Sequence, residues 1–365
     1  MTAKQISCDY IYVTTSSRKQ SQYLKPRRKY VGENLEAICK VQVVRRSDFH
    51  SVPVSAAYAQ NTRTITVNCN NGQSLNRTLS ELNKQTPAIV IVQGTCTEYV
   101  PIDGFESLTL RGQSGAAIQQ PATNPHSNSY ALSITGSQGI TVSGLAVHSL
   151  PSVFSGIGIG AGSSQVPLQD VHVDGSWGVW VYEESQVWLV KVSVNITSGY
   201  AAISAFDKSD VHITGGLLER PSNGLFNAGV FVFSGHVTMQ GMTIRDMQTG
   251  IDIYASGSVD LVNVNPVGGA SLVVSGSRGQ GVIVTNNSHA TLAGSSITGG
   301  SHGGLVVANL STIDVQPSSS LTLVSGNVPD LFCDTNSFIT GTANLAGVPT
   351  VNCGNLRSGN TVPLP

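Results

Sequence analysis

The sequence is poor in charged and in aromatic residues. Of 365 residues, 11% are Asp, Glu, Lys or Arg and 6% are Phe, Trp or Tyr, whereas about 25% of the residues in globular domains are charged. So few charges exclude helix bundles and coiled coils, whose surfaces consist of Lys, Glu and Arg. The 39 Gly and 15 Pro make up about 15% of the chain, below the range of about 25 to 30% that is typical of low-complexity disorder.

Other features are absent as well. The net charge of -1 leaves no basic surface for nucleic acid or anionic lipid, so we expect no nucleic-acid partner. No uncharged apolar run reaches about 18 residues, so we expect no membrane span. The length permits a sizeable core, arranged as one long domain or as two.

The first 50 residues differ from the rest. They hold ten of the twenty Lys and Arg but four of the 21 Asp and Glu. Ala57-Tyr58-Ala59 fits a signal-peptidase site, although the apolar stretch that should precede it is missing. A basic arm for nucleic acid or membrane is one interpretation. We favour a leader over 1–59 that is disordered or not part of the mature protein, with the fold in 60–355 and a flexible tail over 356–365.

A repeat governs the chain from about residue 130 to 340. Apolar and other residues alternate in segments that start 21 to 26 residues apart, and a Gly-led alternation follows each segment. Alternation with β-branched residues predicts strands, and this period predicts a solenoid or a propeller. The segments are ITVSGLAV (140–147), VPLQDVHV (166–173), VWLVKVSV (187–194), VHITGGLL (211–218), VTMQGMTI (237–244) and VDLVNVNP (259–266).

The length of the repeat decides between the two architectures. A propeller blade needs about 40 to 45 residues and four strands, whereas these units offer two or three short strands. We therefore predict an all-β fold, a single-stranded right-handed parallel β-helix whose rungs stack at about 4.8 Å. The predicted inward column is Val142, Leu168, Leu189, Ile213, Met239 and Leu261. Gly156, Gly178, Gly229 and Gly250 precede the second strand, where we expect a corner with positive φ.

Both ends of such a solenoid need closing. Leu75, Leu79 and Leu82 form one face of a short amphipathic helix, which we expect to cap the front within 60–100. An irregular cap is expected over 330–355. Cys69 with Cys96 and Cys333 with Cys353 do not match zinc-ribbon spacing, so we favour two disulfides over a metal site. Disulfides imply a secreted protein, extracellular or periplasmic.

The segments TVNCNNGQSLNRTL, IVIVQGTCTEYV and LTLRGQSGAAI, followed by the VSG-type rungs, resemble bacterial right-handed β-helix repeat proteins of the pectate-lyase-like superfamily. The resemblance covers about 65–355 and implies the fold. The superfamily includes polysaccharide lyases, glycoside hydrolases, epimerases and adhesins, so the fold alone assigns no chemistry. The Asn-Thr-Asp, Asp-Asp, Gly-His-Gly and Arg-Ile-Lys motifs of polygalacturonase-like hydrolases are not found.

The last outward position of each rung forms the densest polar stripe. Its candidate catalytic residues are Asp174, Glu219, Arg245 and Asp246. Asp174 and Glu219 lie two rungs apart, roughly 9.6 Å, near the upper end of an inverting acid and base pair. Alternatively, Arg245 is the base of a lyase and an acid holds a cation. The interpretation that we favour is structural, because Glu219 beside Arg245 and Asp170 beside Lys191 fit ordinary cross-rung ion pairs.

A second group of residues fits sugar binding. Trp188 with His172 and His212 predicts an aromatic and polar platform on which a sugar ring could stack, and Lys191 and Arg220 lie beside it. All three Trp fall within 177–188, which marks the second to fourth rungs as the binding surface. Local core and turn packing explains the same pattern equally well.

Two functions remain open. We favour a non-catalytic extracellular or surface solenoid that binds glycan or acts as a spacer, because the family motifs are missing. The alternative is a polysaccharide lyase or glycoside hydrolase acting on an acidic polysaccharide in a groove along rungs two to five. We expect a monomer whose partner is a polysaccharide or cell-surface glycan, with no metal site and no cofactor; a lyase could use Ca²⁺.

Overall fold

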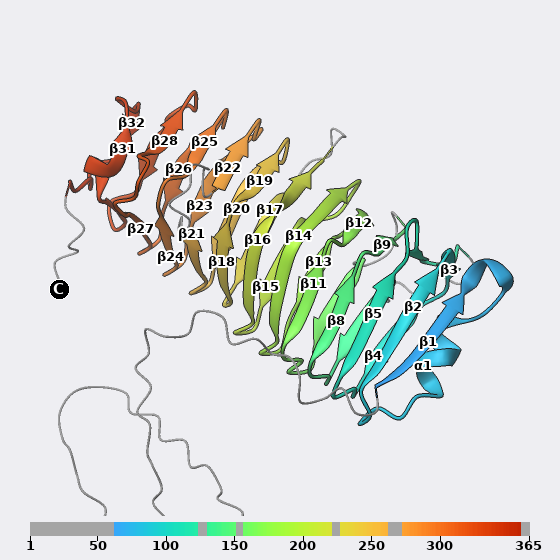
Figure 1. Ribbon diagram of the computed structural model, residues 1–365. Helices are drawn as coiled ribbons and strands as arrows, with labels where there is room; N and C mark the ends of the chain where they lie inside the picture. Colours follow the sequence, from blue (N-terminus) through green and yellow to red (C-terminus); the bar gives the residue numbers. More distant parts are fainter. Residues whose placement is uncertain (1–61, 123–129, 151–155, 221–226, 262–271, 359–365) are drawn as a thin grey trace, which may run out of the picture. The chain divides into compact units, whose positions relative to one another are not determined.

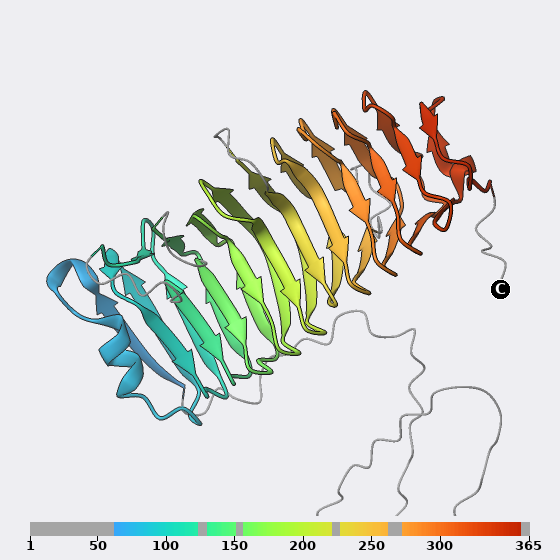
Figure 2. The same cartoon turned by 180° about the vertical axis from the view of Figure 1, so that it is seen from behind.

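The computed structural model describes residues 62–122, 130–150, 156–220, 227–261 and 272–358. The predicted leader over 1–59 and the end of the predicted tail lie outside these residues. The described residues form a parallel β-helix built from two sheets (Figures 1 and 2). The predicted all-β fold class is confirmed.

Each turn of the helix contributes to sheet A twice and to sheet B once. The first arm of sheet A contains β1 (Arg63–Asn68), β2 (Ala88–Gln93), β5 (Leu108–Gly112), β8 (Ile140–Ser143), β11 (Val166–Gln169), the starts of β14 (Gln186–Ile196) and β16 (Asp210–Glu219), β18 (His236–Gln240), β21 (Ser258–Leu261), β24 (His289–Leu292), β27 (Thr312–Val315) and β30 (Phe338–Thr340). The second arm contains β3 (Thr95–Thr97), β6 (Ala117–Gln119), β9 (Ala146–His148), β12 (His172–Gly175), the ends of β14 and β16, β19 (Met242–Arg245), β22 (Leu272–Ser275), β25 (Ser296–Thr298), β28 (Thr322–Ser325) and β31 (Leu345–Ala346). Sheet B contains β4 (Val100–Asp103), β7 (Leu132–Thr135), β10 (Ile157–Gly160), β13 (Val179–Val181), β15 (Ala201–Phe206), β17 (Ala228–Phe233), β20 (Thr249–Tyr254), β23 (Val282–Val284), β26 (Leu305–Val307), β29 (Leu331–Cys333) and β32 (Val351–Asn352).

The rungs stack in the predicted register. Leu168 pairs with Val142 on one side and with Leu189 on the other, and Leu189 pairs with Ile213. Met239 and Leu261 continue this column. All six side chains are at most 2% exposed, so the alternation of apolar residues specifies one continuous core between the sheets.

Left-handed residues bend sheet A between its two arms. The corner residues have φ between 50° and 66° and are Gly144, Asp170, Lys191, Gly215 and Gly241. Glycine adopts this conformation without steric cost, and an L residue there carries some strain. Asp170 and Lys191 occupy successive corners, but the expected ion pair between them is not formed.

The prediction of positive φ at Gly156, Gly178, Gly229 and Gly250 is wrong. None of the four lies in the left-handed region. A Cβ at each position would lie 2.4 Å from a methyl carbon of Val173, Val194, Ile244 or Val274, respectively, which point inward from the second arm. Glycine is therefore required by the close approach of sheet B to these side chains and not by the backbone angle.

A short helix lies at the β1 end of the stack (Figure 1). Helix α1 (Leu75–Ser80) begins after Ser74, whose hydroxyl accepts from the backbone N–H of Arg77. Leu75 and Leu79 on the helix and Leu82 just after it are buried, as their spacing predicts. Short 3₁₀ turns occur at η2 (Cys69–Asn71) and η3 (Thr342–Asn344).

Both predicted disulfides are present. Cys69 pairs with Cys96 and Cys333 pairs with Cys353. One bond ties the segment after β1 to β3, and the other ties β29 to the residue after β32. The terminal rungs are therefore linked covalently to their neighbours.

A buried carboxylate organises the chain near the C-terminal disulfide. Asp330, 5% exposed, accepts from the backbone N–H and hydroxyl of Thr350 at 2.8 and 2.9 Å. It also accepts from the backbone N–H and amide of Asn327, both at 3.0 Å. Burial alone would raise the pKa of Asp330, but these hydrogen bonds outweigh it and lower the pKa below its usual range.

We predict that Gly178→Ala destabilises the fold by about 1 to 3 kcal/mol, because the new methyl group would overpack the interior. Its Cβ would lie 2.1 Å from the carbonyl oxygen of Ala202 as well as against Val194. Urea unfolding measures the change. Gly354→Ala is the control, since no atom lies within 4 Å of a Cβ there; equal stability of the two variants would contradict the packing argument.

We predict that Asp330→Asn lowers stability at pH 7 by about 1 to 3 kcal/mol, because four donors lose a charged acceptor. A lowered pKa stabilises the fold above the unfolded value of about 3.9, and this contribution disappears as the pH falls through the folded pKa. The difference between wild type and variant should therefore shrink on acidification. Urea unfolding at several pH values tests this, with the exposed Asp246→Asn as control; a pH-independent difference would refute it.

Candidate functional site

Among the four candidate residues of the predicted catalytic stripe, only Glu219 and Arg245 form an ion pair with each other. Arg245 donates from Nε to a carboxylate oxygen of Glu219 at 2.8 Å, so these two neutralise each other. Asp174 and Glu219 lie two rungs apart in the same column, and Asn195 stands between them. Asp246 follows β19 in the left-handed conformation and is exposed. The proposed roles of Asp174, Glu219, Arg245 and Asp246 stay predictions.

The predicted sugar platform does not form as one surface. Trp188 and His212 stack, with ring centroids 5.4 Å apart and planes at 20°, so their faces cover each other across neighbouring rungs. His172 lies beyond the corner, on the second arm, where it contacts Asp174 and Ser193. Lys191 is the exposed corner residue itself. Arg220, in contrast, is buried at 5% exposure.

The outer surface of sheet B gathers most of the aromatic residues that the structure describes. Trp180 and Phe206 stack at 4.9 Å, and the edge of Tyr200 meets Phe231 at 4.7 Å. Phe233 and Tyr254 continue the series at 5.6 Å. We call this surface the aromatic face; it consists of Tyr130, Trp177, Trp180, Tyr182, Tyr200, Phe206, Phe231, Phe233 and Tyr254.

A cavity of about 270 Å³ adjoins the aromatic face. Polar groups reach it from a stretch of five successive rungs, from β15 to β26: Tyr200 precedes β15, Asp252 lies in β20, and His302 precedes β26. Its full lining is Tyr200, Asn227, Ala228, Gln248, Thr249, Asp252, Gly279, Gln280 and His302. Convergent polar groups in a concave site beside an apolar surface are typical of ligand binding.

Tyr200 and Asp252 form the electrostatic centre of this cavity. The Tyr200 hydroxyl donates to the Asp252 carboxylate at 3.2 Å, across two rungs. Burial raises the pKa of Asp252, and the hydrogen bond from Tyr200 offsets only part of that effect. Burial and the adjacent carboxylate raise the pKa of Tyr200 to about 12. Both groups are therefore held toward their protonated forms.

Two buried residues near this region carry donor atoms that make no hydrogen bond among the described residues. Asn227, 3% exposed, lines the cavity, and its Nδ2 makes no hydrogen bond. Arg220 donates from Nη2 to the carbonyl of Thr197, but its Nε and Nη1 are unpaired. Burial and the nearby Arg278 lower the pKa of Arg220. Unpaired buried donors are costly, and an anionic or oxygen-rich ligand would satisfy them.

The cavity offers one carboxylate. Asp252 is the only acidic residue among the described residues that line it. The internal segments outside the described residues, 123–129, 151–155, 221–226 and 262–271, contain no Asp or Glu. Hydrolysis by an acid and base pair needs two carboxyl groups, so the lining fits proton transfer by tyrosine and histidine better than paired-carboxylate hydrolysis.

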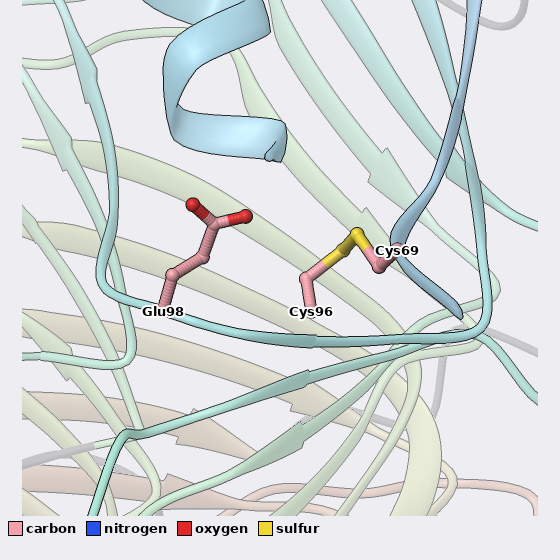
Figure 3. Close-up of side chains that lie close together, drawn as sticks. All are labelled: Cys69, Cys96 and Glu98. Carbon is pink, nitrogen blue, oxygen red and sulfur yellow. A yellow bond between two sulfur atoms is a disulfide. The ribbon is translucent and has the colours of Figure 1, made fainter. Parts of the chain in front are cut away.

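Cys69, Cys96 and Glu98 form another cluster of potential metal ligands (Figure 3). The two sulfurs are joined in a disulfide and cannot bind as thiolates. Glu98 accepts from the Ser74 hydroxyl and the Leu75 N–H, both at 2.6 Å. The Glu98 carboxylate thus satisfies the N-terminus of α1, where negative charge is favourable, and the cluster is structural.

Comparisons with known proteins find similarity among solved structures. No protein-family model matches the chain, and no curated protein sequence matches it. An alginate lyase from Paenibacillus sp. str. FPU-7 is similar in structure, with a TM-score of 0.45 and 13% identity over 82% of this chain and 98% of the lyase. The catalytic domain of a GH87 alpha-1,3-glucanase in complex with nigerose has a TM-score of 0.39 and 12% identity over 84% of this chain and 70% of the glucanase. Both proteins are similar to this chain in structure at low sequence identity, and the comparison assigns no chemistry to the chain.

The cysteines indicate the redox environment of the protein. Two disulfides indicate an oxidising, extracytoplasmic environment. Among the described residues, no helix has the length and apolar character needed to span a membrane.

We predict that Asp252→Asn stabilises the protein at pH 7. A raised pKa means that the Asp252 contribution is fully present below the unfolded value of about 3.9 and is lost as the pH rises through the folded pKa. The neutral amide keeps an acceptor for Tyr200 and avoids a buried charge. Urea unfolding at pH 4 and pH 7 measures the gain, and the exposed Asp103→Asn on β4 is the control. A destabilised Asp252→Asn at pH 7 would contradict the assignment.

Proposed function

We propose that this protein is a secreted, carbohydrate-active β-helix that binds an acidic polysaccharide on the aromatic face and cleaves it by β-elimination in the adjoining cavity. The observation that carries the proposal is the hydrogen-bonded pair of Tyr200 and Asp252, whose pKa values are both raised. The same cavity contains the unpaired side-chain amide nitrogen of Asn227. Strongly perturbed pKa values in a concave site are typical of functional residues.

The charges of the site favour an acidic sugar. Because burial disfavours the charged form of Asp252, a substrate carboxylate meets less repulsion there. The Asn227 amide can donate to that carboxylate. Arg220 and Arg278 add positive charge without an acidic partner among the described residues, and Arg220 belongs to the substrate-binding set predicted from the sequence.

Elimination needs one proton removed and one delivered. A base takes the proton from the carbon next to the uronate carboxylate, the electron pair forms a carbon–carbon double bond, and the bond to the glycosidic oxygen breaks. We assign His302 as the base, since its imidazole lines the cavity. Tyr200, which keeps its proton because its pKa is raised to about 12, then protonates the leaving oxygen.

Non-catalytic glycan binding is the second candidate. The aromatic face extends over Trp180, Phe206 and Phe233 to Tyr254, beyond the residues that line the cavity. Such a surface binds sugar rings through apolar contact without any proton transfer. This function keeps the polysaccharide partner and removes the role of Tyr200 as an acid.

We predict that uronate-containing polysaccharides, but not neutral ones, give an unsaturated product that absorbs in the ultraviolet. Tyr200→Phe should lower this activity about 100-fold or more, because general acid catalysis contributes on that scale. Tyr99→Phe is the matched control and should retain activity, since Tyr99 neither lines the cavity nor belongs to the aromatic face. Asp174→Asn and Glu219→Gln test whether the predicted catalytic stripe on sheet A contributes to the activity.

The other outcomes discriminate between the candidates. Reducing ends without ultraviolet absorbance would indicate hydrolysis. Retained binding without any product would favour the glycan-binding solenoid. Full activity of Tyr200→Phe together with loss of activity in Glu219→Gln would indicate that the catalytic site lies on sheet A.

A further inference from the structure

Three potential metal ligands meet on the outer surface of the second arm of sheet A. His148 lies on β9, and His172 and Asp174 lie on β12. His148 Nδ1 and His172 Nε2 lie 3.2 and 2.9 Å from the same oxygen of Asp174. The three side chains are 40%, 46% and 30% exposed, so an ion in solution can reach them.

The strand register explains why these groups converge. His172 and Asp174 are two residues apart on one strand and therefore point to the same side of the sheet. His148 stands directly opposite Asp174 on the neighbouring rung. Two ligands that share an ion at about 2.1 Å lie roughly 3 to 3.4 Å apart, and both nitrogen-to-oxygen distances are close to this range.

The surroundings can support the ligands. The Ser193 hydroxyl lies 2.7 Å from His172 Nδ1; because a hydroxyl can accept as well as donate, it can hold a proton on Nδ1 and leave Nε2 free to ligate. Asn195 follows Asp174 in the same column, and its buried Oδ1 has no hydrogen-bond partner among the described residues.

We propose that His148, His172 and Asp174 form a binding site for a divalent transition-metal ion of the Zn²⁺ class. Two imidazoles favour such ions over Ca²⁺ and Mg²⁺, which prefer oxygen ligands. Three protein ligands leave a further position for water or a substrate oxygen. Both histidine side chains are exposed, so their rings can turn toward the ion as it binds.

The chain carries its own comparison site on the first arm. His212 Nε2 lies 3.0 Å from Asp210, and His212 Nδ1 lies 2.7 Å from the Thr238 hydroxyl. Opposite Asp210 stands Gln186, whose amide approaches the same carboxylate oxygen at 3.4 Å. This arrangement repeats the proposed site with one imidazole replaced by an amide, and it should bind metal weakly.

Isothermal titration of the chelator-treated full chain with Zn²⁺ tests the proposal. We expect one ion per chain, with affinity at least 10-fold weaker in His148→Gln and in Asp174→Asn. His212→Gln should leave the affinity unchanged. Co²⁺ should give visible absorption bands that the same two variants lose, and excess Ca²⁺ should not compete.

Gln186→His provides a gain-of-function test, because it supplies the missing imidazole and should add a second ion per chain. Thermal unfolding of the metal-free variants checks that they fold. Zn²⁺ affinity that is unchanged in both His148→Gln and Asp174→Asn, or equally weakened by His212→Gln, overturns the proposal. The test does not depend on cleavage of any polysaccharide, so its failure leaves the proposed function unaffected.

Discussion

Backbone hydrogen bonds between successive rungs hold equivalent residues about 4.8 Å apart, and the rest of the structure depends on this spacing. Inside, it stacks Leu168 between Val142 and Leu189, and all three side chains are buried. Outside, it brings residues from different rungs into contact whether or not they attract each other. Glu219 and Arg245 meet as an ion pair, and Trp188 and His212 meet as a stack, for this one reason.

The two outer surfaces differ in how far their polar side chains are paired with one another. On sheet A, polar side chains largely satisfy one another, as His212 does with Asp210 and Thr238. On sheet B, Asp252 stands opposite Phe231 on the neighbouring strand, and its burial disfavours its charge. A surface whose polar groups are already paired is stable, whereas a carboxyl group and an amide that lack full solvation favour a ligand.

The sequence predicts the core better than the site. Inward columns follow from alternation and period alone, and the cysteine pairs follow from their positions in the two end segments. The repeat shows the glycines before sheet B. The reason why glycine is needed there, close contact with Val194 and its equivalents, depends on the distance between the sheets, which the sequence does not give. Tyr200 and Asp252 are 52 residues apart. The alternation in GIDIYASGS indicates that Asp252 faces outward. Its neighbours Tyr200 and Phe231 come from other rungs, which no single repeat reveals.

The positions of the two disulfides affect how the molecule comes apart. A terminal rung of a solenoid has a neighbour on one side only, so thermal opening normally starts at the ends and travels inward. Here Cys69–Cys96 and Cys333–Cys353 fasten the outermost rungs to the ones behind them. Local unfolding from either end is therefore restricted, and proteolysis requires a less frequent opening of the central rungs. Such a chain is suited to long survival in the presence of proteases.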